Sequence, residues 1–487
     1  MPIRPIVAVV VGLITGLFAV VAFSNDGDLD TSFGGSGEVS AFVGTAGGGD
    51  VKVLGQADGG VVLIGTTGGG AIGVTRLHAD GSTDTSFGVN GKTIVAVPSG
   101  GSAYSALGAL DAAGRIVAGG TVEFGDHSVM FVMRLTGSGQ LDSTFNNSGT
   151  LSIDRTFVTA QGDTVAAIAV FSDPQAASAD DSILVAGSMQ DQYGPFNARN
   201  LAVVPLHADG SYFTSVPVGN DSFFFGGISD IAYCYRTAVS GANGYDSAAS
   251  ITRRWFPDSS SELIAVGGNA FSSGTVPDFG VVVELDGSLH AINSFGISGF
   301  SHFIFATSGT AQVNALTFDD SNRVLVAGID TSTNHYNLAV GRIMTDGNYD
   351  TSFNGNGRII INFDEAGETS YSQGETIMVQ HDGRLLAGTQ VVQSSVGANF
   401  QFGLVRLTAD GAADPTFTSG TSIAGAHKYA FSAGNDFANS AGFTQGEKIL
   451  LGGIVDQPNN AFGVLRATTD RIFGDGVEAP AYLPRIP

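Results

Sequence analysis

The sequence predicts an all-β fold, a seven-bladed β-propeller, from three observations. A short motif recurs along much of the chain at intervals of roughly 54 to 64 residues. An apolar run that ends in small residues occurs seven times, and glycine supplies 70 of the 487 residues. No segment shows helical periodicity. Repeats of this length, each with several short strands, are typical of propellers with about four strands per blade.

The recurring motif is Asp-x-Ser/Thr-Phe, usually preceded by an Asp-Gly turn. It occupies Asp30–Phe33, Asp84–Phe87, Asp142–Phe145, Asp350–Phe353 and Asp414–Phe417, with a weaker copy that ends at Phe295. Asp-Gly between apolar runs predicts a tight hairpin, because glycine adopts positive φ without a steric cost.

The seven apolar runs predict one buried strand in each repeat. They are Val61–Gly65, Arg115–Gly119, Ile183–Gly187, Leu263–Gly267, Val324–Gly328, Leu385–Gly388 and Ile449–Gly452. A continuous apolar run closed by glycine predicts a strand that is covered on both faces, where backbones approach closely.

Charge pairs are predicted within the repeats. In four of them an arginine stands eight residues before the aspartate of the motif: Arg76 and Asp84, Arg134 and Asp142, Arg342 and Asp350, Arg406 and Asp414. Residues facing each other across a hairpin form charge-assisted hydrogen bonds. In the third and fourth repeats Pro205 and Glu284 replace the arginine, and Phe213 and Ile292 replace the aspartate. Both charges are lost together, as a partly buried pair requires.

The seventh repeat predicts how the ring closes. It contains Arg466, but the matching Asp-Gly-x-x-Asp motif does not follow it; the motif stands at 26–30 instead. We therefore expect the N-terminal segment to complete the last blade and to pair Asp30 with Arg466, which would protect the sheet edges.

The N-terminus predicts export. Arg4 precedes an apolar run, Ile6–Phe23, and acidic residues follow it, as in a Sec-type signal peptide over 1–24 or an uncleaved anchor. The propeller is then expected over 25–478, with a tail at 479–487 and a secreted or cell-envelope location. The single cysteine, Cys234, allows no intrachain disulfide.

Composition and motifs predict neither a cofactor nor catalytic residues. The net charge of −24 disfavours nucleic acid as a partner, and the eight histidines are dispersed. Asp26, Asp28 and Asp30 alternate as calcium ligands do, but Thr31 stands where a calcium loop needs glycine. Turns stabilised by aspartate and an ion pair are therefore preferred over a metal site, with calcium as the alternative.

The least regular stretch, 211–260, predicts a contact surface. Its candidate ligand-binding residues are Tyr233, Tyr235, Arg236, Arg254 and Trp255. Aromatic rings beside arginines can stack on a sugar or anchor a protein partner. The alternative is an insertion that covers its own apolar surface.

The pattern Asp-Gly-x-Leu-Asp-Thr-Ser-Phe-Gly-x-x-Gly, at 26–37, resembles the delta-60 repeat of exported bacterial proteins. The resemblance extends over roughly residues 26–470 and implies a propeller and export, without an activity. We expect a monomeric binding or scaffold module for an extracytoplasmic protein or glycan. The alternatives are a propeller hydrolase or lyase with scattered residues in a central channel, which carboxylates with raised pKa would favour, and a purely structural envelope protein.

Overall fold

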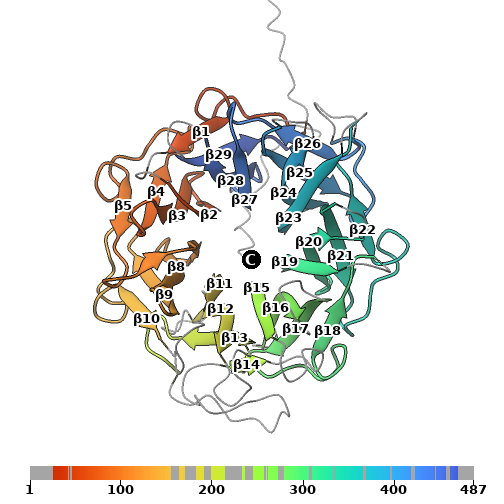
Figure 1. The fold of residues 1–487 in the computed structure, drawn as a ribbon, viewed down its shortest axis with the longest axis horizontal. Helices are drawn as coiled ribbons and strands as arrows, with labels where there is room; N and C mark the ends of the chain where they lie inside the picture. Colours follow the sequence, from red (N-terminus) through yellow and green to blue (C-terminus); the bar gives the residue numbers. More distant parts are fainter. Residues whose placement is uncertain are drawn as a thin grey trace, which may run out of the picture.

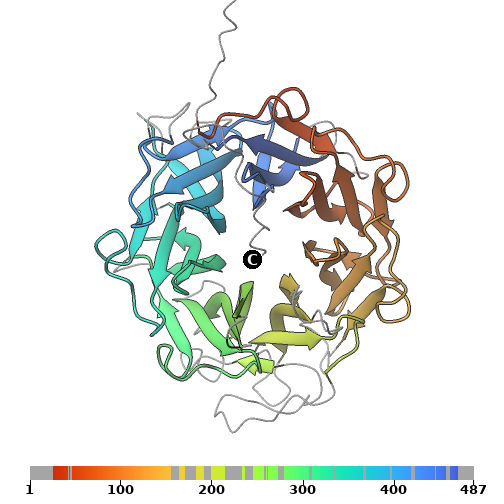
Figure 2. The same ribbon diagram turned by 180° about the vertical axis from the view of Figure 1, so that it is seen from behind.

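The structure is a computed structural model in which every regular element is a strand. It describes residues 26–41, 43, 46–154, 164–170, 182–190, 199–213, 233–235, 245–256, 259, 261–271, 279–306, 310–332, 335–365, 369–394, 398–417, 423–444, 446–456 and 461–469. Seven separate sheets form a ring around a common axis (Figure 1), and Figure 2 shows the opposite face of the same ring. The predicted seven-bladed propeller is confirmed. Among the described residues there is no helix of the length and hydropathy needed to span a bilayer.

Each blade is an antiparallel sheet that runs from an axial strand outward. Blade 1 contains β2 (Ala46–Gly55), β3 (Val61–Thr67), β4 (Ile72–Leu77) and β5 (Lys92–Val95). Blade 2 contains β6 (Ser102–Ala103), β7 (Leu107–Leu110), β8 (Ile116–Glu123), β9 (Ser128–Leu135) and β10 (Thr150–Ile153). Blade 3 contains β11 (Thr164–Val170), β12 (Ile183–Gln190), β13 (Arg199–Leu206) and β14 (Tyr233–Tyr235).

The next three blades repeat this order. Blade 4 contains β15 (Tyr245–Phe256), β16 (Ser261–Phe271), β17 (Phe279–Asp286) and β18 (Phe300–Phe303). Blade 5 contains β19 (Ala311–Phe318), β20 (Val324–Asp330), β21 (Asn337–Ile343) and β22 (Arg358–Ile361). Blade 6 contains β23 (Ser370–Val379), β24 (Leu385–Gln393), β25 (Gln401–Leu407) and β26 (Ala426–Tyr429).

Blade 7 is built from both ends of the described chain. Its strands are β27 (Asp436–Phe443), β28 (Ile449–Val455), β29 (Ala461–Ala467) and β1 (Glu38–Ala41). The outermost strand, β1, pairs with β29 so that Val39 lies opposite Val464. The Asp30 amide also donates to the Arg466 carbonyl at 2.8 Å. The N-terminal segment therefore completes the last blade, and this part of the prediction is confirmed.

The second strand of each blade lies in the core between neighbouring blades. In blade 2 this strand is β8, because β6 and β7 both pair with β8 and together take the place of the first strand. Every residue of β3, β20 and β28 is buried. Glycine is required there for close packing: a Cβ on Gly453 would lie 1.8 Å from the Phe437 carbonyl oxygen, and one on Gly65 would lie 2.5 Å from the Phe462 ring. The apolar runs closed by glycine are thus the central strands of the blades.

Hairpin order gives the ring two different faces. The turns from first to second strand and from third to fourth strand lie on one face, which we call the turn face; it carries the Asp-Gly turns and the Asp-x-Ser/Thr-Phe motif. The other connections lie on the opposite face. The predicted signal segment 1–24 and the tail 479–487 lie outside the described residues, as does much of 211–260.

Candidate functional site

On the turn face, an arginine from the third strand joins one blade to the next. In blade 6, Arg406 donates from Nε to Asp414 Oδ2 at 2.8 Å and from Nη2 to Thr416 at 2.9 Å. Its guanidinium carbon lies 4.5 Å from the centre of the Phe417 ring, and Nη1 contacts Asp26 in blade 7. One fully buried side chain thus ties its own blade to its neighbour by charge-assisted and cation–π contacts. We call this set of contacts a blade latch.

The blade latch recurs in blades 1, 2, 5 and 7. The closest nitrogen–oxygen distances are 2.6 Å for Arg76 and Asp84, 2.8 Å for Arg134 and Asp142, 2.8 Å for Arg342 and Asp350, and 2.7 Å for Arg466 and Asp30. In these blades Nη1 donates to a backbone carbonyl in the turn of the next blade, at Gly137, Ala208, Ala409 and Ala79 respectively. The structure therefore brings together all five pairs that the sequence singles out.

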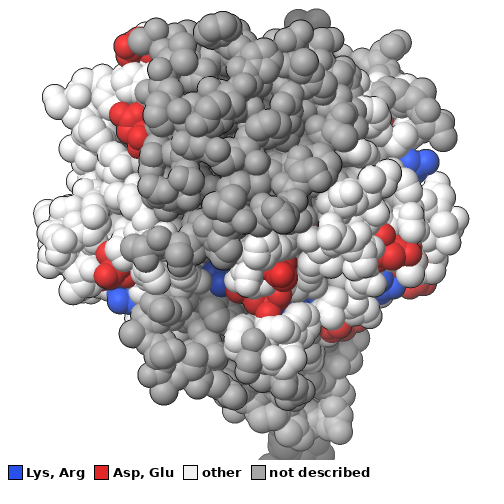
Figure 3. All heavy atoms as spheres, turned by 90° about the horizontal axis from the view of Figure 1, so that it is seen from below, with Lys and Arg blue, Asp and Glu red and all other residues white. Residues whose placement is uncertain are grey.

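The latch aspartates are held in their charged form. Burial raises the pKa of Asp30, but hydrogen bonds from Lys448 and Ser32 and the charge of Arg466 outweigh it, so that the pKa falls to about 2. The hydrogen bond from Ser86 lowers the pKa of Asp84 to about 2 despite some burial. These carboxylates are engaged by the protein itself. On the described part of the rim that Figure 3 shows, acidic side chains at the surface also lie close to basic ones.

The two junctions around blade 4 lack this latch. Pro205 and Glu284 hold the arginine positions of blades 3 and 4. Two arginines of the axial strand β15 bind the neighbouring blades instead. Arg253 donates to the Ser182 carbonyl and hydroxyl in blade 3, both at 3.0 Å. Arg254 reaches the other way, into blade 5.

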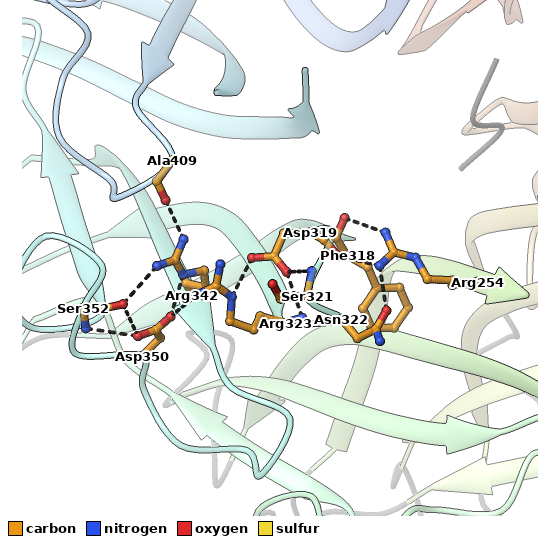
Figure 4. A network of polar contacts seen from close by, with 10 residues as sticks. All are labelled: Arg254, Phe318, Asp319, Ser321, Asn322, Arg323, Arg342, Asp350, Ser352 and Ala409. Carbon is orange, nitrogen blue, oxygen red and sulfur yellow. Dashed lines mark hydrogen bonds and ion pairs between the residues drawn. The ribbon is translucent and has the colours of Figure 1, made fainter. Parts of the chain in front are cut away.

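Arg254 is part of a network that continues into blade 6. It donates to Asn322 Oδ1 at 2.7 Å and to the Asp319 carbonyl, and its guanidinium lies 5.6 Å from the centre of the Phe318 ring. Arg323 then bridges Asp319 and Asp350 at 2.7 and 2.8 Å, and Arg342 continues from Asp350 to Ala409 (Figure 4). Arg254, one of the predicted ligand-binding residues, thus makes a contact between blades.

The other predicted contact residues within the described chain lie on two different strands. Tyr233 and Tyr235 lie on β14, the outermost strand of blade 3, whereas Trp255 lies on β15, the axial strand of blade 4 (Figure 1). Trp255 is half-buried and stands opposite Glu262. Arg236 lies outside the described residues.

The axial strands differ from blade to blade. In blades 3 to 7 a β-bulge at one register position leaves a single residue unpaired: Ala166, Ala249, Asn314, Glu375 and Asn439. Bulges re-aim side chains and are frequent beside functional sites. Polar residues thus occupy the bulge of blades 5, 6 and 7. Of these three blades, blade 7 lies next to blade 1.

Four polar residues near the axis form what we call the axial group: Asp50 and Lys52 on β2, Glu375 on β23 and Asn439 on β27. Blade 7 separates blade 6 from blade 1, yet Asp50 acts electrostatically on Glu375. The two carboxylates are therefore close enough to interact electrostatically. Asn439, on the intervening strand, has a buried Oδ1 with no hydrogen-bond partner.

The ionisable members of the axial group are shifted towards their neutral forms. Burial, with a contribution from Asp50, raises the pKa of Glu375 to about 8. Burial also raises the pKa of Asp50 and lowers that of Lys52. The side chain of Asp50 is exposed, whereas those of Lys52 and Glu375 are half-buried. Within the described part of the chain, no hydrogen bond or ion pair engages these three side chains.

The acidic N-terminal segment is occupied by cations of the protein. Asp26 contacts Arg406, and Asp30 contacts Arg466 and Lys448. Among the described residues, no three His, Cys, Asp or Glu side chains lie together so as to hold a metal ion. The geometry of this segment is that of a blade latch.

Sequence reasoning missed the axial group. The available signal was local: Asp50 and Lys52 flank a buried valine in one strand, and Glu375 follows a glycine in another. Ionisable residues inside otherwise apolar or small-residue strands mark positions with a special environment. Which of them meet, however, depends on closure of the ring.

Comparison with known proteins supports the fold. A family model described as a domain of unknown function (DUF5122) beta-propeller matches residues 56–87, 114–145 and 380–417, about a fifth of the chain. Each match runs from the first turn of a blade to the phenylalanine of its motif. These three segments are therefore similar to repeats of a propeller family. No curated protein matches it.

Solved structures with similar folds are distant in sequence. They include polysaccharide lyase Uly1 (9% identity, TM-score 0.42, covering 88% of this chain and 91% of that chain). They also include BBS1N in complex with ARL6DN (9%, 0.44, 90% and 98%) and a glucose dehydrogenase (10%, 0.37, 88% and 99%). Likeness at this level has no bearing on activity.

Proposed function

We propose that this protein is an exported binding module that holds a saccharide at the axial group. One observation carries the proposal: the arginines and aspartates of the five blade latches engage one another, whereas the axial group has ionisable side chains that no described residue engages by a hydrogen bond or an ion pair. Charged groups that are desolvated and unpaired lower stability, so their presence at one place favours a functional role.

The chemistry of the axial group favours a polyhydroxyl ligand. With a pKa of about 8, Glu375 is mostly protonated at neutral pH and can both donate and accept a hydrogen bond. Lys52 supplies donors, while Asp50 and Asn439 supply acceptors. A set of donors and acceptors with a small net charge suits sugar hydroxyls better than it suits an ion. We place the site at the axial group rather than at the surface predicted over 211–260, because Arg254 of that surface is engaged in a contact between blades.

The cellular location of the protein, outside the cytoplasm, is part of the same proposal. The apolar segment Ile6–Phe23 supports export, and the delta-60-like repeat supports a bacterial envelope protein. An extracytoplasmic site would meet polysaccharides directly. A monomer is the expected state, since the N-terminal strand already covers the open edge of blade 7.

A ligand screen tests this function. Thermal melts of the purified protein with a panel of envelope polysaccharides and simple glycans should give a rise of several degrees for one glycan class. Glu375→Gln and Lys52→Met should each weaken that binding about tenfold, the loss of one or two good hydrogen bonds. Glu123→Gln, an exposed glutamate at the end of β8, is the matched control. Unchanged affinity in both axial variants would overturn the proposed site.

The raised pKa values also favour a second candidate, a propeller hydrolase or lyase. A carboxyl group that is protonated at neutral pH can act as a general acid, and Asp50 supplies a second carboxyl group nearby. Release of new chain ends from the bound polysaccharide, abolished by Glu375→Gln while binding persists, would establish catalysis. Binding without any turnover would support the binding module over the enzyme.

A further inference from the structure

We propose that the junction between blades 4 and 5 binds the guanidinium group of an arginine from a partner protein, at Glu284. This site is distinct from the axial group and does not depend on the function proposed above. It follows from a comparison of this junction with the five that carry a blade latch.

Glu284 stands in the arginine position of a latch with the same backbone geometry. It faces Ala265 in the register in which Arg406 faces Leu386. Its amide donates to the Gly299 carbonyl at 3.2 Å, as that of Arg406 does to Gly425 at 2.7 Å. Its side chain therefore leaves the sheet towards the same place as the latch arginines.

Much of the latch is still present around it. Phe295 is fully buried like the other motif phenylalanines, and Ser294 stands where Ser352 contributes to the latch of blade 5. The turn of the next blade also docks in the usual way, since the Gly296 amide donates to the Asp346 carbonyl at 2.8 Å. What differs is the pair of charged residues: Glu284 replaces the arginine, and Ile292 replaces the aspartate.

The result is a carboxylate without its cation. Glu284 is only 3% exposed, and its Oε1 is buried without a hydrogen-bond partner. A glutamate side chain ends near the level at which arginine begins its guanidinium. An arginine entering from the turn face would thus place its planar group where the other blades hold theirs, against a carboxylate, a serine and a phenylalanine ring. Guanidinium suits this set better than ammonium, because it pairs in two directions and stacks on aromatic rings.

The protonation of Glu284 gives the proposal a second readout. Burial raises the pKa of Glu284 to about 7. The carboxylates on the elements around it are Glu262 and Asp286 in its own blade and Asp346 in the facing turn, while His290 lies in its own hairpin; none of them is a cause of this shift. Binding of a guanidinium requires the ionised form, so affinity should rise between pH 6 and pH 8.

Saturation-transfer NMR with N-acetyl-arginine amide as the probe tests the site on the purified protein. Signal should appear at millimolar probe, increase with pH, and be absent for N-acetyl-citrulline amide, which has the same shape without the charge. Glu284→Gln should reduce the signal at least fivefold and abolish its pH dependence, whereas Glu123→Gln should leave both unchanged. Glu284→Arg, which supplies the guanidinium within the chain, should also abolish it.

The isosteric Glu284→Gln variant decides the matter even if Glu284→Arg fails to fold. Equal signals from the arginine and citrulline probes would overturn the proposal. So would a signal that persists in Glu284→Gln, because it would then arise elsewhere on this acidic surface.

Discussion

The junctions on the two sides of blade 5 differ sharply, although the same backbone contacts form both. Between blades 5 and 6, Arg342 joins Asp350 to the turn that carries Ala409. Between blades 4 and 5 the turn still docks on Gly296, but the buried Oε1 of Glu284 has no hydrogen-bond partner among the described residues. Packing of the turns and phenylalanines therefore specifies the ring, and the charged latch adds stability to a contact that forms without it.

The junctions of blade 4 also show how a missing latch is replaced. Arg253 and Arg254, adjacent on the axial strand, bind blades 3 and 5 respectively. These contacts hold blade 4 near the axis, whereas a latch holds a blade near the rim. The comparison predicts that latched and unlatched junctions respond differently to mutation, pH and hydrogen exchange.

The largest effect is expected at a fully buried latch. Arg406→Met removes the completely buried cation between Asp414 and Asp26 and leaves them only the longer contacts of Arg384, at 3.4 and 3.5 Å. Loss of one partner of such a group costs about 3–5 kcal/mol. Arg254→Met should cost only about 1–2 kcal/mol, because the groups it leaves are mainly neutral acceptors. Urea unfolding of the two variants measures the difference, and equal losses would contradict the special role of the latch.

Acid should weaken the latches next. Asp30 and Asp84 have pKa values of about 2 in the folded protein, below the ordinary value of 3.8. Their contribution is therefore complete above about pH 4 and is lost as the pH falls towards 2. The melting temperature should drop steeply over this range. In Asp30→Asn the drop should be shallower and start from a lower plateau; an unchanged profile would show that the pair adds no stability.

A rise in pH from about 5 to 8 should weaken the unlatched junction between blades 4 and 5. The pKa of Glu284 is raised from 4.5 to about 7, so the folded state loses stability as the pH rises from about 5 to 8. Glu284→Gln should remove this part of the decline, a gain of a few degrees in melting temperature at pH 8 and little change at pH 5. The same melts of Glu375→Gln test whether ionisation of Glu375 in the axial group also lowers the stability of the folded protein. Parallel curves for the wild type and Glu284→Gln would show that Glu284 does not titrate in this range.

The smallest effect is expected from rebuilding the latch. Glu284→Arg combined with Ile292→Asp restores both charged residues beside Ser294 and Phe295, and should raise stability by about 1 kcal/mol. Glu284→Arg alone should gain less, since its aspartate partner is missing. Thermal melts at pH 7 compare the three proteins. A double variant less stable than Glu284→Arg alone would mean that the site cannot hold the pair.

The sequence predicted the repeating part of this molecule and not the part that departs from it. The five charge pairs and the closure by Asp30 and Arg466 could be found because the repeats show which residues change together. The contact of Arg254 with blade 5 could not be predicted, because its partner Asn322 is 68 residues away in another blade. The axial group was missed for a similar reason, since Asp50 and Glu375 meet only when blade 7 closes the ring between them.

Hydrogen exchange measured strand by strand tests the central claim most directly. The account predicts that backbone amides of β25, which carries the buried Arg406, exchange more slowly at pH 7 than those of β17, which carries Glu284, and that Arg406→Met removes much of this difference. Equal protection of the two strands in the wild-type protein would contradict the claim that the latches, over and above the packing of the blades, hold the rim of the ring together.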